Sequence, residues 1–137
     1  MKYFLKLNVV SILYAFMIFV PLELMANVYR ISRLTDWDLG TVNILIDVTN
    51  IIIFIFGTIL LYFLTKKWMK GRKANFWTVI IWVPYFVLLV YIFASLFPIT
   101  YRGDHPNPVT GLIAIGALIV YPIYILFINF LGLAEDE

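Results

Sequence analysis

Two acidic residues, Glu23 and Asp47, lie inside long apolar stretches of this 137-residue chain. A charged side chain in a membrane-spanning segment costs roughly 2.5–3.5 kcal/mol near the bilayer centre on insertion scales, so such residues are candidates for functional sites. Each acid lies nearer one end of its stretch than the middle, which lowers that cost. The other sixteen charged residues fall at the chain ends or between the stretches, so any chemistry is expected to start with these two acids.

Each acid belongs to a row of polar residues with helical spacing. The rows are Glu23, Asn27 and Arg30, and Asn43, Asp47 and Asn50. The spacing i, i+4, i+7 places each row on one face of a helix. Because a short connection joins the two stretches, we expect the rows to face each other or a shared, outward-facing cavity.

These rows are compatible with three roles. Asn and Asp side chains join membrane helices by hydrogen bonds worth about 0.6–2 kcal/mol each. Alternatively, the rows form a site for an ion or a ligand, or they lie exposed at the membrane surface.

Catalysis is a further interpretation, because a carboxylate pair that shares a proton catalyses reactions in some enzymes. The local patterns of the lipoprotein signal peptidases, which pair two aspartates in a four-helix membrane domain, are absent, so we expect no catalytic residues.

The composition excludes several kinds of cofactor site. The chain has no cysteine and one histidine, His105. Thiolate metal sites, iron–sulfur clusters and multi-histidine metal sites within one chain are therefore excluded. We expect no metal and no cofactor.

The elements that carry these residues are predicted to be transmembrane helices. The chain is 64% hydrophobic and 13% charged, too apolar for a soluble domain of this size. Four apolar runs are long enough to cross a bilayer, which needs about 20 residues: 7–26, 41–64, 76–97 and 109–133. We predict an all-α integral membrane protein, with residues 1–137 forming one four-helix bundle of two hairpins.

The connections on one side of the membrane differ in kind. Residues 27–40 place Val28, Ile31 and Leu34 at helical spacing, which predicts a short interfacial helix, with Thr35 or Asp36 capping the helix that follows. Residues 98–108 are rich in proline and predict a non-helical turn. The Arg-Gly-Asp triplet within it is interpreted as chance.

Basic residues predict the orientation. Seven of the ten lie before the first helix or between the second and third, which makes both termini cytoplasmic in a cell membrane. The composition is rich in amino acids that have AT-rich codons, which favours a bacterial source. The basic segment between the second and third helices contains Lys66, Lys67, Lys70, Arg72 and Lys73. It is a topology signal or a contact for anionic lipid headgroups, and a loop this short beside a membrane is not expected to bind nucleic acid.

Small residues predict a helix-packing face on the fourth helix. Its members are Gly111, Ala114, Ala117 and Tyr121, with Gly57 as a similar position on the second helix. Small side chains allow close helix packing. The face serves contacts within the chain or self-association.

Together these features favour a protein that works through protein or lipid contacts, without catalysis. It would be an accessory subunit, a regulator or an immunity-type protein, with another membrane protein or itself as partner. The alternative is a small oligomeric transporter or channel that uses Glu23 or Asp47 as a proton or cation site. A lipid-modifying enzyme is the third possibility and has the least support.

Overall fold

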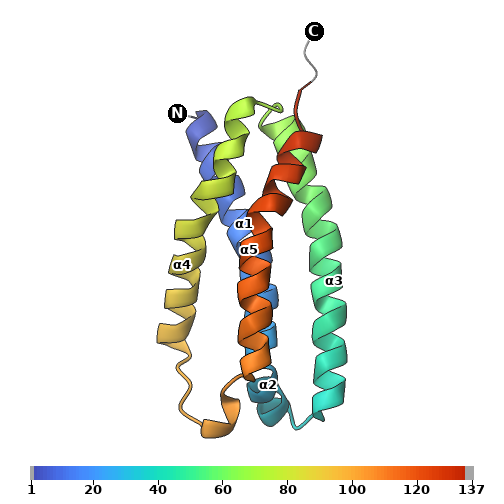
Figure 1. Cartoon of the computed structure of the whole chain (residues 1–137), viewed down its shortest axis with the longest axis vertical. Coiled ribbons are helices and arrows are strands. Elements are labelled where there is room, and N and C mark those ends of the chain that lie inside the picture. Colours follow the sequence, from blue (N-terminus) through green and yellow to red (C-terminus); the bar gives the residue numbers. More distant parts are fainter. Residues whose placement is uncertain (1, 135–137) are drawn as a thin grey trace.

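The computed structural model describes residues 2–134 and contains four long helices (Figure 1). These are α1 (Lys2–Ala26), α3 (Leu39–Phe63), α4 (Thr78–Leu96) and α5 (Pro108–Leu131). Shorter elements join them: α2 (Val28–Thr35), a π-helical turn η1 (Leu64–Trp68) and two 3-10 turns, η2 (Lys73–Trp77) and η3 (Arg102–Asp104). Residues 2–134 contain no strand. The acidic residues 135–137, part of the end predicted to be cytoplasmic, lie outside the described residues.

Four helical spans are long and apolar enough to cross a membrane, which confirms the predicted all-helical class. Each predicted run overlaps one of them, and the ends differ by a few residues. The largest difference is at α1, which begins at Lys2 because the helix also includes residues 2–6, where two lysines flank three apolar or aromatic residues. The short helix predicted within residues 27–40 is confirmed as α2.

Figure 1 shows α1 at the centre, behind α5, with α3 and α4 on either side. The two described ends of the chain lie at one end of the bundle, here called the terminal end, together with η1 and η2. The opposite end, here called the α2 end, holds α2 and the connection that leads into α5. Helix α1 packs most extensively against α4, and to a lesser extent against α3 and α5.

The main core brings all four long helices together. Val10 and Tyr14 of α1, Leu61 of α3 and Ile125 of α5 are fully or almost fully buried there. The Tyr121 hydroxyl donates a hydrogen bond to the Tyr14 carbonyl oxygen, which ties α5 to α1. One cavity of about 400 Å³ lies toward the α2 end, and another of the same volume lies beside the middle of α1 and α3.

A smaller core joins α2 to α3. Val28 of α2 packs against Val42 and Ile46 of α3, and all three are buried. Residues 42 and 46 share one face of α3, and the residue that follows each of them points about 100° away around the helix axis. This packing therefore fixes how α3 is rotated about its axis.

The cap of α3 differs from the prediction. Thr35 ends α2, and Asp36 adopts a left-handed conformation with φ 61°, so neither residue caps α3. Asp38 does so instead, because its carboxylate accepts hydrogen bonds from the backbone nitrogen and the hydroxyl of Thr41. The connection predicted to be non-helical also contains one short turn, η3.

Candidate functional site

The first polar row lies against α4. Glu23, Asn27 and Arg30 line a cavity of about 400 Å³ between α1, α4 and the connection that follows α4. The other lining residues are apolar: Ala26, Val90, Phe93, Ala94, Phe97, Pro98, Ile99 and Pro106. A second hollow of about 360 Å³ borders the same seam and is lined by the same three polar residues.

Hydrogen bonds hold this row in place. Asn27 lies between α1 and α2, and its side-chain nitrogen donates to the Glu23 carboxylate at 3.0 Å and to the Glu23 carbonyl oxygen at 2.8 Å. Arg30 donates through Nη1 to the carbonyl oxygen of Phe97, at 3.0 Å. Phe97 is the C-cap of α4, where a cation interacts favourably with the helix dipole. Arg30 thus fastens the start of α2 to the end of α4.

The second polar row has a different environment. Asn43 and Asp47 are exposed on α3. Asn50 is half-buried and lines a separate cavity of about 380 Å³ between α1, α3 and α5, mostly among apolar residues. Its Oδ1 atom is buried and has no hydrogen-bond partner among the described residues.

The two rows therefore do not form the shared pocket expected from the sequence. The reason is the rotation of α3: Val42 and Ile46 face α2, so the side chains of Asn43 and Asp47 project to the flank of the helix. Glu23 faces α4 instead of α3. Within residues 2–134, no three His, Asp or Glu side chains gather as a metal-binding group.

Asp104 is a polar residue at the α2 end that the sequence did not predict to be part of a site. Arg33 binds its carboxylate through two hydrogen bonds, Nε to Oδ1 at 2.9 Å and Nη2 to Oδ2 at 2.7 Å. Arg30 Nε lies 3.6 Å from Asp104 Oδ2. The Asp104 side chain is only 3% exposed, and the Arg33 guanidinium also lies 4.6 Å from the centre of the Tyr101 ring. Arg30, Arg33 and Asp104 are called the clamp below.

The clamp has a clear electrostatic consequence. The Arg33 guanidinium that hydrogen-bonds Asp104 holds the pKa of that carboxyl below its usual value. The sequence did contain a signal: Arg30 and Arg33 lie on one predicted short helix, and the Pro-rich turn expected on the same side of the membrane carries one acid, the Asp of the Arg-Gly-Asp triplet interpreted as chance.

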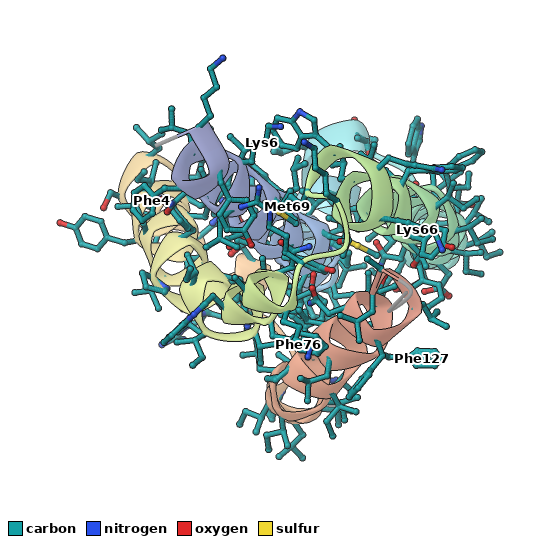
Figure 2. All side chains as sticks on the ribbon, turned by 90° about the horizontal axis from the view of Figure 1, so that it is seen from above. Phe4, Lys6, Lys66, Met69, Phe76 and Phe127 are labelled. Carbon is teal, nitrogen blue, oxygen red and sulfur yellow. The ribbon has the colours of Figure 1, made fainter. Side chains whose placement is uncertain are left out.

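The basic segment lies at the terminal end, which Figure 2 shows from above with Lys6, Lys66 and Met69 labelled. Lys66 lies over the ring of Tyr62 and Arg72 over the ring of Tyr3, at 5.9 and 4.5 Å from the ring centres. The segment's three remaining cations are exposed: Lys67, Lys70 and Lys73. Met69 is buried beneath them.

A buried polar network, also missed from the sequence, supports this segment. The Tyr3 hydroxyl donates to the Asn75 side-chain oxygen, and Asn75 donates to the Thr65 carbonyl oxygen at 3.3 Å. The Thr78 hydroxyl donates to the Asn75 carbonyl oxygen at 2.7 Å, and Asn129 donates to that hydroxyl at 3.1 Å. The network joins all four long helical spans at the terminal end.

The small-residue face is only partly used within the chain. Ala117 packs against the main core, and Tyr121 is part of it. A methyl group at Gly57 would lie 2.9 Å from the Met17 sulfur, so this glycine allows α3 to approach α1 closely. Ala114 is half-buried, whereas a methyl group at Gly111 would have no neighbour within 4 Å.

Comparisons with protein-family models, with curated proteins and with solved structures give no match for this chain.

Proposed function

We propose that this chain is a small integral membrane protein that acts through contacts with other membrane molecules and catalyses no reaction. The observation that carries this proposal is the exposure of Asp47, about 12 Å along α3 at 1.5 Å per residue. A carboxylate that faces hydrocarbon is costly. A partner that donates hydrogen bonds to it removes that cost, which favours a role as an accessory subunit, regulator or immunity-type protein.

The proposed orientation puts the terminal end in the cytoplasm. The basic segment and both N-terminal lysines lie at this end, and cytoplasmic loops of membrane proteins are enriched in such residues. The clamp and the Glu23 cavity then face outward. The exposed cations Lys67, Lys70 and Lys73 are suited to anionic headgroups of the inner leaflet, at about 1 kcal/mol per charge.

Neutralising Asp47 tests the contact role. We expect Asp47→Asn to shift the protein from a complex to its single-chain size in mild detergent at unchanged abundance, because the contact loses its charged acceptor. Asp36→Asn is the matched control: it also removes one acid, outside the long helices, and Asn tolerates the positive φ there. A complex that survives both Asp47→Asn and Asp47→Leu would contradict the proposal.

The second candidate is a small transporter or channel with a proton or cation site at Glu23. Its support is the position of this carboxylate in the α1–α4 cavity, where Asn27 donates a hydrogen bond to it. Asp47, the other acid expected for such a site, lies outside that cavity. In proteoliposomes, Glu23→Gln should then abolish a pH- or cation-dependent flux that Asp36→Asn leaves intact.

A further inference from the structure

We propose that the α1–α4 cavity binds a phosphate–ammonium zwitterion, with the ammonium on Glu23 and the phosphate on Arg30. We assign its source as the headgroup of a phosphatidylethanolamine-type lipid. This site goes beyond the proposed contact through α3, because it lies on a different face of the molecule and uses none of the same residues.

The charges of the cavity match such a group. Glu23 and Arg30 are the charged residues among those that line it, and they form no ion pair with each other. Among the described residues, the Glu23 carboxylate accepts a side-chain hydrogen bond from Asn27 alone, although a carboxylate has about four acceptor positions. Arg30 uses Nη1 for the Phe97 carbonyl and turns Nε toward Asp104, which leaves donors of its guanidinium for an anion.

The walls of the cavity match the apolar part of a lipid. Phe93 and Phe97 lie on α4 with their ring centres 5.1 Å apart, and both line the cavity. An ammonium group gains further attraction from such rings. The second hollow on the same seam is lined by Phe19, Val20 and Leu24 of α1, so apolar surface continues from the charged pair along the helices.

The depth of the charged pair also fits a headgroup. Glu23 lies three residues, or about 5 Å, before the end of α1 at Ala26. Arg30 lies just beyond that end, in α2. The pair therefore brackets one end of an apolar span, which is where the polar region of a bilayer begins.

Hydrogen-bonding chemistry selects among lipids. A primary ammonium carries three donors and can satisfy the Glu23 carboxylate, whereas the quaternary ammonium of a choline headgroup has none. An anionic headgroup such as that of phosphatidylglycerol offers Glu23 no cation at all. The cavity volume of about 400 Å³ lies within the range of about 300–1,000 Å³ typical of ligand sites.

Native mass spectrometry of the purified protein tests this proposal, with equal amounts of phosphatidylethanolamine, phosphatidylcholine and phosphatidylglycerol added. We expect a preference for phosphatidylethanolamine of about tenfold, the size of one hydrogen bond to a charged group. Glu23→Gln should remove that preference, while Asp36→Asn should retain it. Equal binding of the three lipids, or a preference that survives Glu23→Gln, would overturn the proposal.

A second variant tests the cavity without changing its charges. Ala94→Phe places a ring in the cavity lining and should abolish phosphatidylethanolamine binding, while helicity by circular dichroism stays at the wild-type level. Persistent binding in this folded variant would also overturn the proposal. Competition with soluble glycerophosphoethanolamine distinguishes a lipid headgroup from a free solute with the same charges. If the site binds a lipid, glycerophosphoethanolamine competes only weakly with phosphatidylethanolamine. If glycerophosphoethanolamine competes as well as the lipid, the assignment to a lipid is wrong.

Discussion

Asp104 joins two parts of the chain that are 71 residues apart in sequence. Its carboxylate is almost fully shielded from solvent and receives two hydrogen bonds from Arg33. A bidentate pair between Arg and a carboxylate fixes geometry as well as charge. At the scale of single residues, this pair therefore decides where the connection between α4 and α5 lies relative to α2.

The clamp predicts a pH dependence of stability. The pKa of Asp104 in the folded protein is below its ordinary value of 3.8. The stability that its carboxylate contributes to the folded protein is therefore complete at pH values well above 3.8. It is lost as the pH falls through the lower folded pKa. We expect Asp104→Asn to lower the unfolding temperature in detergent by a constant amount from pH 7 down to about pH 5, and by a decreasing amount below.

Thermal unfolding of wild type and Asp104→Asn across this pH series measures the difference directly. Asp38, whose carboxyl pKa is also lowered by its hydrogen bonds with Thr41, titrates equally in both proteins and cancels in the comparison. A difference that already shrinks between pH 7 and pH 5 would show that the clamp is not the cause.

At the scale of elements, the turn after η1 depends on Gly71. Its φ is 61°, and a methyl group there would come within 2.4 Å of the Ala134 backbone nitrogen. That nitrogen donates a hydrogen bond to the Gly71 carbonyl oxygen, so the turn is attached to the residues that follow α5.

Two glycine-to-alanine changes should act in opposite directions. Gly71→Ala should lower the free energy of unfolding by at least about 1–2 kcal/mol, the cost of a left-handed conformation for an L-residue. Gly111→Ala, inside α5 with open space around it, should raise the free energy of unfolding by up to about 1 kcal/mol through helix propensity. Equilibrium unfolding in mixed micelles measures both, and a loss of stability in Gly111→Ala would indicate that this position packs closely against another helix.

The elements were predictable from the sequence, but their rotations were not. The length of each apolar run predicts the long helices, and the spacing of Val28, Ile31 and Leu34 predicts α2. The second polar row lies on one helix, α3, as predicted, whereas the first row is divided between α1, Asn27 and α2. Which neighbour a row meets depends on contacts between distant residues, such as Val42 and Ile46 with α2, and single-helix periodicity contains no information about them. Asp104 lies in a connection, where no periodic pattern marks a buried acid.

At the scale of the whole molecule, the absence of cysteine allows the proposed orientation to be tested with single introduced thiols. His105 belongs to the connection before α5, at the α2 end, and Lys67 belongs to η1, at the terminal end; both are exposed. In intact cells, a membrane-impermeant maleimide should label His105→Cys, and it should label Lys67→Cys only after the membrane is permeabilised. The reverse pattern would contradict the proposed orientation.

The seam between α1 and α4 is hydrogen-bonded near both ends. Toward the terminal end, the Tyr85 hydroxyl donates to the Asn8 side-chain oxygen at 2.6 Å. At the α2 end, Arg30 holds the Phe97 carbonyl. The stretch between these bonds belongs to the spans that would face the bilayer. The hollow at Glu23 continues along apolar side chains of that stretch, such as Phe19 and Val20. A guest of Glu23 with an apolar tail would therefore exchange with the surrounding leaflet, so the lipid composition of that leaflet, more than the solutes in the water outside, would determine what occupies the cavity.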